Sequence, residues 1–180
     1  MRILKEDTVG LVIDVQEKLF PHMQEKEGLE ENLTRIIAGL AVIGIPILVT
    51  EQYVKGLGLT IASVHQVLGD FSSLEKLSFS CCDEPDFMNA LKSHGKRNVI
   101  ICGIETHVCV LQTAIDLLAE GYQPIVIEDC VSSRKLSDKQ TAIKRMRQEG
   151  AIISSMESIL FELTRTSGTE TFKAISRLVK

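Results

Sequence analysis

This sequence contains few aromatic residues and few prolines, and it lacks long apolar runs. It contains no tryptophan, only 4% aromatic residues and 4 prolines in 180 residues. No apolar run is long enough to cross a membrane. We expect no secretion signal at the N-terminus, since its one apolar run is short and is interrupted by Asp14. We therefore expect a cytoplasmic protein that does not enter a membrane.

An excess of positive charge is also missing. The chain has 20 basic and 24 acidic residues, a formal net charge of −4, and like charges do not gather in long blocks. Proteins that bind polyanions by electrostatics usually present basic clusters. We therefore expect neither nucleic acid nor an anionic membrane surface as a partner.

The cysteines do not form a recognisable framework. There are 5 of them, at positions 81, 82, 102, 109 and 130. An odd number in apolar or loop contexts, without a CxxC pair, predicts reduced thiols rather than disulfides. Cys81 and Cys82 are adjacent, which is the wrong spacing for a metal knuckle.

Apolar runs of strand length alternate with helix-period segments along the chain. The runs are TVGLVIDV (8–15), IPILVTE (45–51), RNVIICG (97–103), QPIVIED (123–129) and GAIISS (150–155). Near-continuous apolar strands are typical of a parallel sheet that is covered on both faces. The pattern predicts a doubly wound α/β fold, and the length fits one domain over residues 1–180.

Helices are expected between and after these strands. The helical segments are 29–43, 61–68, 85–94, 106–121, 137–149, 157–163 and 169–179. Four glycines follow helical segments, where a left-handed cap is favoured: Gly44, Gly95, Gly121 and Gly150. Asp83 and Ser137 are predicted as N-caps, with Pro85 early in its helix.

Ligands of open α/β sheets bind at the carboxyl ends of the strands. The candidates at those ends are Asp14 with Gln16, Glu51 to Tyr53, Gly103 to Cys109, and Asp129 to Arg134. Lys76 is a further candidate, in a segment that could form a short strand or an active-site loop.

Cys109 stands early in a predicted helix, after the apolar run VIIC and a glycine. The positive end of the helix dipole and a nearby lysine would lower the pKa of its thiol. Asp14 could exchange the thiol proton, and Lys76 could supply the positive charge. From the residues alone, the structural roles stand beside the catalytic ones: a packed small hydrophobe for Cys109, a turn cap for Asp14 and a solvated lysine for Lys76.

Four separated segments resemble, in order, the isochorismatase-like cysteine hydrolases. They are LVIDVQEKLFP, LVTEQYVKGLG, EKLSFSC and ICGIETHVCVLQTAIDLLAEGYQPIVIEDCVSSR, and the likeness runs from about residue 8 to about residue 163. EQYVKGLG is similar to the isochorismatase domain-containing branch and its bacterial relatives rather than to nicotinamidases. The resemblance implies a three-layer α/β/α sandwich around a mainly parallel sheet.

The resemblance also implies the chemistry. The catalytic triad would be Asp14, Lys76 and Cys109, hydrolysing the C–N bond of a small amide through a thioester. A non-proline cis peptide would join Ile104 to Glu105, and the N–H groups of Glu105 and Cys109 would form the oxyanion hole. True isochorismatases cleave a vinyl ether and lack the cysteine, so Cys109 argues against that reaction.

The sequence departs from nicotinamidases in the residues that bind their metal. The Asp-x-His pair and further histidine that hold a metal in nicotinamidases have no counterpart in TEQYVKGLGLTIASVHQ, where His65 stands alone. We predict no metal and no cofactor.

The segments that should converge on the triad predict a small, partly apolar pocket lined by Gln16, Phe20, Gln52, Tyr53, Phe79, Thr106 and His107.

The sequence leaves open the roles of His107 and Arg134 and the identity of the substrate. His107 could line the pocket or be purely structural, and Arg134 could grip a substrate carboxylate or support its own loop. His22 and His94 are expected at the surface. Nothing separates a carbamoyl, ureido, lactam or simple carboxamide substrate.

The alternative to an enzyme is a noncatalytic or regulatory protein that uses the same fold for binding or assembly. Redox and nuclease roles lack support, since the sequence has no CxxC pair and no basic groove.

The resemblance implies a homo-oligomer, a dimer or larger. The apolar residues Phe172, Ile175, Leu178 and Val179 of the C-terminal helix could pack on a partner or on the chain's own sheet.

Overall fold

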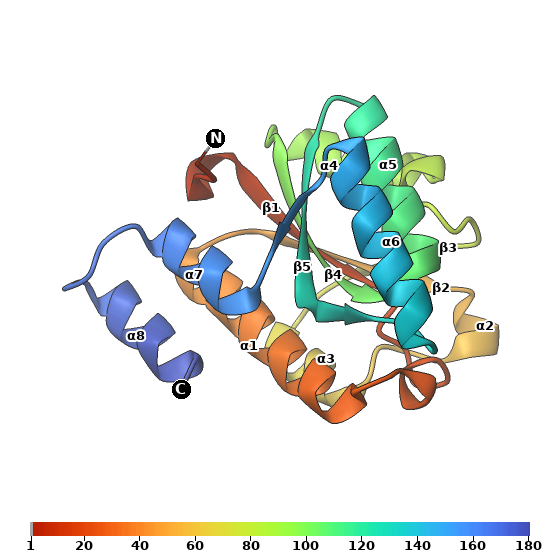
Figure 1. The fold of residues 1–180 in the computed structure, drawn as a ribbon, viewed down its shortest axis with the longest axis horizontal. Helices are drawn as coiled ribbons and strands as arrows, with labels where there is room; N and C mark the ends of the chain where they lie inside the picture. The colour runs from red at the N-terminus through yellow and green to blue at the C-terminus, as the bar shows by residue number, and fades with distance from the viewer. Residues whose placement is uncertain (1) are drawn as a thin grey trace.

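An all-parallel sheet of six strands forms the middle layer of the computed structural model, which describes residues 2–180 (Figure 1). The strands are β1 (Thr8–Ile13), β2 (Ile47–Gln52), β3 (Ser73–Lys76), β4 (Asn98–Ile104), β5 (Gln123–Ser132) and β6 (Ile152–Ser154). Their order across the sheet is β3-β2-β1-β4-β5-β6. Five of them fall on the predicted apolar runs. β3 resolves the question left open for the segment around Lys76, which is a strand at the sheet edge.

Helices cover both faces of the sheet, which confirms the predicted three-layer fold. They are α1 (Lys26–Ile43), α2 (Val54–Leu57), α3 (Ala62–Leu68), α4 (Pro85–Ser93), α5 (Leu111–Ala119), α6 (Leu136–Glu149), α7 (Met156–Thr164) and α8 (Glu170–Leu178). Helices α1, α3, α7 and α8 lie on one side, and α4, α5 and α6 lie on the other (Figure 1). The sequence did not predict α2, because its four residues are too few to show a period.

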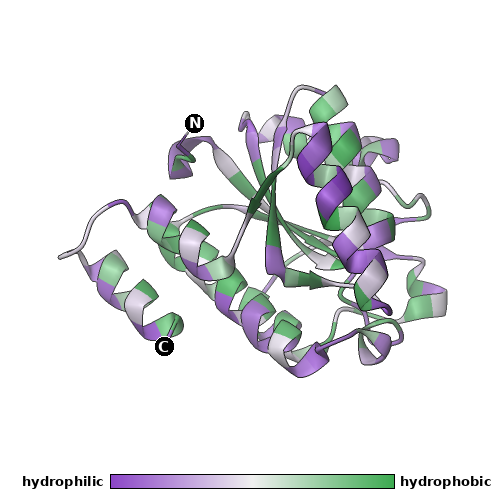
Figure 2. Ribbon diagram, in the orientation of Figure 1, coloured by the Kyte–Doolittle hydropathy of each residue, from purple (hydrophilic) through white to green (hydrophobic). Residues whose placement is uncertain are grey.

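Each face of the sheet packs its own hydrophobic cluster. Along β4, Val99 and Ile101 belong to the cluster under α4 to α6, whereas Ile100, Cys102 and Ile104 belong to the cluster under α1 and α7. This alternation follows from the two-residue period of a strand. Figure 2 shows hydrophobic strands between helices whose outer surfaces are hydrophilic.

The predicted helix ends are partly right. Gly44 and Gly150 cap α1 and α6 in the left-handed conformation, at φ 83° and 113°, as expected where a Cβ would be unfavourable. The predicted N-caps are wrong. Asp83 lies in a 3-10 turn, Cys81–Asp83, and the N-cap of α4 is Glu84. Ser137 lies inside the first turn of α6, whose N-cap is Lys135.

The C-terminal helix α8 packs on its own chain, against α1 and α7. Ile175 is fully buried, and the rings of Phe161 and Phe172 lie 6.0 Å apart between centroids. Its apolar stripe therefore covers the helical layer of the same molecule. Oligomer formation stays a prediction. Among residues 2–180, the structure contains no helix with the length and apolar character needed to span a bilayer.

Candidate active site

The candidate residues meet where the direction of strand addition reverses, between β1 and β4. From β1 the chain adds β2 and β3 on one side, and from β4 it adds β5 and β6 on the other. Such switch points open a crevice at the carboxyl ends of the strands. Gly103 lies at this crevice with φ 120°, and a Cβ there would come within 2.1 Å of the Ile13 carbonyl oxygen. Only glycine allows β4 to approach β1 so closely.

Asp14 and Lys76 form a buried ion pair at this crevice. The Lys76 Nζ lies 2.7 Å from Asp14 Oδ2, and the two side chains are 1% and 0% exposed. The Thr50 hydroxyl donates to Asp14 Oδ1 at 2.8 Å. Lys76 also donates to the carbonyl oxygens of Ser78 and Phe79, both at 3.1 Å. Burial is the largest single influence on the pKa of Lys76 and lowers it, but the Asp14 carboxylate together with Cys109 and Cys81 raises it by more, so the pKa is raised overall.

Gln52 connects this pair to the cysteine. Its Oε1 accepts from Lys76 Nζ at 2.6 Å and lies 3.8 Å from Cys109 Sγ. Gln16 fixes the Gln52 backbone, donating to its carbonyl at 2.9 Å and accepting from its N–H at 2.7 Å. Gln16 is fully buried and does not line the cavity, so it is a brace for Gln52 rather than the pocket wall that the sequence predicted.

Cys109 lies in a π-helical turn, Thr106–Val110, directly before α5. The amides of Val108 and Val110 donate to the Glu105 carbonyl at 3.1 and 3.2 Å. The peptide bond between Ile104 and Glu105 is cis. Within residues 2–180, the Glu105 N–H makes no hydrogen bond. Cys109 itself is 7% exposed, at the floor of a cavity.

The environment of the Cys109 thiol contradicts one expectation. Burial, followed by the negative charge of Asp14, raises its pKa to about 12, although Lys76 acts in the opposite direction. The predicted lowering of the pKa by the helix start and the lysine is therefore wrong, because desolvation and the carboxylate outweigh both. At neutral pH Cys109 is a thiol and needs a base to become a nucleophile.

A cavity of about 350 Å³ opens above this thiol. Its lining residues are Leu19, His22, Gln52, Leu57, Phe79, Glu105, Val108, Cys109 and Arg134. It is mostly apolar, with one amide and one arginine among its polar groups. Of the predicted pocket residues, Gln52 and Phe79 line it.

The other predicted pocket residues lie elsewhere. Phe20 is buried in the cluster under α1, because the irregular turn there directs Leu19 to the cavity instead. Tyr53 is 48% exposed and its ring covers Gly56, while Thr106 is fully buried. His107 has its Nδ1 2.9 Å from the Ser133 hydroxyl and is not a lining residue, which favours the structural role.

Sequence reasoning missed four residues of the cavity wall: Leu19, His22, Leu57 and Val108. His22 is exposed, as expected, but it also borders the cavity. Leu57 belongs to α2, which the sequence did not predict. Val108 could have been found, since it directly precedes the candidate nucleophile.

Arg134 both supports its loop and lines the cavity. Its Nε donates to Glu105 Oε1 at 2.6 Å, and Glu105 is 6% exposed. The two roles that the sequence left open for Arg134 are thus compatible.

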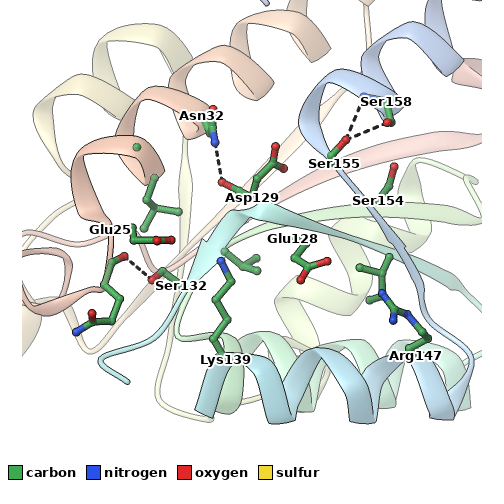
Figure 3. Close-up of a pocket in the computed structure, with 15 residues that line it drawn as sticks. Glu25, Asn32, Glu128, Asp129, Ser132, Lys139, Arg147, Ser154, Ser155 and Ser158 are labelled. Carbon is green, nitrogen blue, oxygen red and sulfur yellow. Dashed lines mark hydrogen bonds between the residues drawn. The ribbon is translucent and has the colours of Figure 1, made fainter. Parts of the chain in front are cut away.

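A larger cavity, of about 770 Å³, lies at the carboxyl ends of β5 and β6 (Figure 3). Lys139 and Arg147 extend into it from α6, with Glu128 opposite them on β5. These three side chains form no ion pair among the described residues, and no cysteine or histidine lines this cavity. Over residues 2–180, no group of three or more His, Cys, Asp or Glu side chains is placed to hold a metal ion.

Comparisons with known proteins agree with this fold. Residues 8–158 match the Isochorismatase domain. Isochorismatase family protein 1B of Dictyostelium discoideum is 35% identical over 184 residues, covering 99% of this chain and 89% of that protein. The secreted isochorismatase effector Isc1 of Phytophthora sojae is also 35% identical, with 99% and 87% covered. A structure described as MAR1 ribonuclease from Caenorhabditis elegans superposes with a TM-score of 0.93 at 37% identity, covering 99% of this chain and 92% of the other.

Proposed function

The chain belongs to the isochorismatase family, and we propose that it is a cysteine-dependent hydrolase that cleaves the C–N bond of a small amide. Cys109 is the nucleophile, Asp14 the proton carrier and Lys76 the cation that pairs with the Asp14 carboxylate. The observation that supports this most is the buried Asp14–Lys76 pair, at 2.7 Å, beside a mostly apolar cavity that Cys109 lines. Burying two charges costs free energy that a purely structural role would not require here.

In the first half of the reaction, Asp14 accepts the thiol proton as the Cys109 sulfur attacks the amide carbonyl. A raised thiol pKa fits this step, because the proton is then transferred only when substrate is present. Asp14 returns that proton to the amine nitrogen when the C–N bond breaks. Ammonia or an amine leaves, and the acyl group remains on sulfur as a thioester.

In the second half, water attacks the thioester and gives one proton to Asp14. The C–S bond breaks, the acid is released, and the proton returns to Cys109. The net reaction is one amide plus one water giving one acid and one amine. Lys76 stays protonated throughout, since its four oxygen partners all stabilise the ammonium.

The negative oxygen of both tetrahedral intermediates requires donors. We propose the N–H groups of Glu105 and Cys109, and the absence of any hydrogen-bond partner for the Glu105 N–H in residues 2–180 supports this. Loss of one such donor typically raises the barrier by about 2.7 to 4 kcal/mol.

The test is hydrolysis of a library of small primary amides, ureido acids and lactams, followed as ammonia release for the first two classes and as the ring-opened amino acid for the lactams, with Cys109→Ala as the control. Turnover by the wild type, and none by Cys109→Ala, is the expected result. Binding of library members without turnover by either protein would instead favour the noncatalytic alternative.

Ribonuclease activity is the second candidate, because the Caenorhabditis elegans structure is described as a ribonuclease. A net charge of −4 and a cavity with one arginine give little attraction for a polyanion. We expect RNA incubated with the wild type to be cleaved no faster than with Cys109→Ala. Cysteine-dependent RNA cleavage would replace the amidase proposal.

We further propose a cytoplasmic homo-oligomer. The five free thiols are compatible with a reducing compartment. Leu77 and Phe79 beside the cavity are 73% and 54% exposed, which is unusual for apolar side chains without a partner. Light scattering gives the mass in solution, and fractionation of the native cells gives the compartment. A monomeric mass would refute the homo-oligomer. Recovery of the protein outside the cells would refute the cytoplasmic location; Isc1 is described as secreted.

A further inference from the structure

Resting on the proposed amide hydrolysis, we infer that Thr50 is a positioning residue for Asp14, and that the Cys81 thiol orients the Thr50 hydroxyl. Thr50 holds Oδ1 of the carboxylate, so that Oδ2 is the oxygen that takes the Cys109 proton. The inference comes from a buried chain of polar groups behind Asp14, for which the three triad residues alone give no reason.

Thr50 holds Asp14 through both its backbone and its side chain. It pairs with Ile13 in the register of β1 and β2, and its carbonyl accepts from the Asp14 N–H at 3.1 Å. Its hydroxyl donates to Asp14 Oδ1 at 2.8 Å. Asp14 has φ 51°, in the left-handed region that is unfavourable for most residues other than glycine. One residue therefore fixes both an unfavourable backbone conformation and the direction of the carboxylate.

The Cys81 thiol determines where the Thr50 hydroxyl points. Burial, followed by the negative charge of Asp14, raises the pKa of this thiol to about 11, so that it is an S–H donor at neutral pH. Its Sγ donates to Thr50 Oγ1 at 3.9 Å. A hydroxyl has one proton and two lone pairs. Because one lone pair of Thr50 accepts from Cys81, its single proton is directed to Asp14 Oδ1.

The chain of polar groups continues to the helix that follows the nucleophile. The Cys81 N–H donates to the Thr113 hydroxyl at 2.9 Å, and Thr113 belongs to α5. Thr113 and Cys81 are 0% exposed and Thr50 is 1% exposed. None of the three lines the Cys109 cavity, so their role is not to contact the substrate. The chain connects α5 to Asp14 through bonded groups, as buried polar atoms require.

The two oxygens of Asp14 have different surroundings. Oδ1 accepts from Thr50, whereas Oδ2 faces Lys76 Nζ at 2.7 Å in an ion pair. Within residues 2–180, no hydrogen bond ends on Oδ2. The same ammonium contacts Gln52 Oε1, which lies 3.8 Å from Cys109 Sγ. In the proton transfer, the S–H bond of Cys109 breaks and an O–H bond forms at Oδ2, while the sulfur electron pair forms the C–S bond.

The other titratable groups around Asp14 keep one protonation state at neutral and acid pH. They are Lys76 of β3, Cys81 of the 3-10 turn and Cys109 of the π-helical turn. The pKa of Lys76 is raised although burial lowers it, and the pKa of each thiol is raised chiefly by burial. All three therefore stay protonated as the pH falls, and activity that is lost in acid depends on the Asp14 carboxylate.

The experiment follows kcat against pH, because a purely structural role of Thr50 would not move the acid limb of this profile. The proteins are wild type, Thr50→Val, Thr50→Ser and Thr8→Val. Valine has the shape of threonine without the hydroxyl, and serine keeps the hydroxyl. Thr8 is the matched control, since it is fully buried at the other end of β1 and its hydroxyl donates to the Leu4 carbonyl at 2.7 Å.

Thr50→Val should lower kcat by about 10- to 100-fold, as for the loss of a hydrogen bond to a charged group, and change KM by less than about threefold. The acid limb should move to higher pH by about one unit, because the hydroxyl stabilises only the charged carboxylate. Thr50→Ser should keep the wild-type limb, and Thr8→Val should keep the limb and a kcat within about twofold. A limb that stays in place in Thr50→Val, or that moves equally in Thr50→Ser, would overturn the inference.

Cys81→Ala tests the orienting thiol, and it keeps the inference open to refutation if Thr50→Val does not fold. This variant should lower kcat by about two- to tenfold and move the acid limb in the same direction, by less than Thr50→Val does. Cys81→Ser, whose hydroxyl is also a donor, should recover most of the loss. An unchanged kcat and limb in Cys81→Ala would overturn the role of Cys81.

Acylation of Cys109 by p-nitrophenyl acetate separates this inference from the proposed function. This activated ester does not depend on the fit of an amide, and mass spectrometry locates the acetyl group. If no amide is hydrolysed, the amidase proposal fails, but an acid limb of acylation that moves in Thr50→Val and not in Thr50→Ser would still support the role of Thr50. No acylation of Cys109, acylation without an acid limb, or a limb that Thr50→Val leaves in place would each overturn the inference.

Discussion

The two cavities at the carboxyl edge of the sheet differ in size and in chemistry. The one beside β1 and β4 has a volume of about 350 Å³, against about 770 Å³ for the one beside β5 and β6. The smaller cavity lies above a buried ion pair and a cysteine. The larger one is bordered by more charged side chains, but Glu128 and Arg147 are exposed to solvent. Volume alone would select the larger cavity, which no cysteine or histidine lines.

The difference arises from the local dielectric environment. A charge in contact with water costs little and interacts weakly, whereas a buried charge must be compensated by a partner. Asp14 and Lys76 are compensated at 2.7 Å, and their fields act at short range on Cys109. Arg147 is exposed and Lys139 is only half-buried, so water reaches both charges and screens them.

The largest expected contrast is the loss of the nucleophile. Cys109→Ala should lower kcat for amide hydrolysis by about 10⁴-fold or more, because no other side chain at the site can form the thioester. Ammonia release measures this. Cys82→Ala, another free thiol outside the cavity, should retain wild-type activity. Equal losses in the two variants would contradict the assignment.

The next contrast concerns stability. Lys76→Met should lower the free energy of unfolding at pH 7 by about 3 to 5 kcal/mol, because Asp14 is left as a buried, uncompensated charge. Urea denaturation followed by circular dichroism measures the change. Lys139→Met in the larger cavity should change it by less than about 0.5 kcal/mol. The account of burial fails if the two variants are equally stable.

A smaller contrast is expected in thiol reactivity against pH. Since the pKa of Cys109 is raised to about 12, its thiolate fraction should grow about tenfold for each pH unit between 7 and 10. Iodoacetamide alkylation, read by mass spectrometry, should follow this slope without a plateau. In Asp14→Asn the curve should shift to lower pH, because the carboxylate raises the pKa. A plateau below pH 8 in the wild type would contradict the structure.

The smallest effect is expected at the larger cavity. Lys139→Gln combined with Arg147→Gln should change kcat/KM for amides by less than about twofold, since neither residue borders the Cys109 cavity. Steady-state kinetics on the best amide measures this. A loss above tenfold would mean that the two cavities are coupled.

The sequence predicted the fold well because the sheet is buried on both faces. Each of the four interior strands, and the edge strand β6, falls on an apolar run, and β3 was harder because only Lys76 in it is buried. Asp14, Lys76 and Cys109 were identified from the family resemblance rather than from periodicity. Their convergence depends on strand order, since Lys76 enters the site through its pairing with Gln52 across β2 and β3.

The cavity wall was harder to predict, for physical reasons. A turn without regular period does not reveal whether Leu19 or Phe20 faces inward. Gln16 is polar and follows a strand, which suggests a pocket residue, but its hydrogen bonds are all to backbone groups. The pKa of Cys109 was predicted in the wrong direction because the depth of burial is not visible in the sequence.

The central claim is that Cys109 becomes acylated in the small cavity. The most direct measurement is peptide mass spectrometry of wild-type protein quenched in acid during turnover of an amide. The account predicts the mass of the acyl group on the peptide that contains Cys109, and none in Asp14→Asn, where the base is lost. Amide turnover without any acylated Cys109, or acylation of another residue, would contradict it.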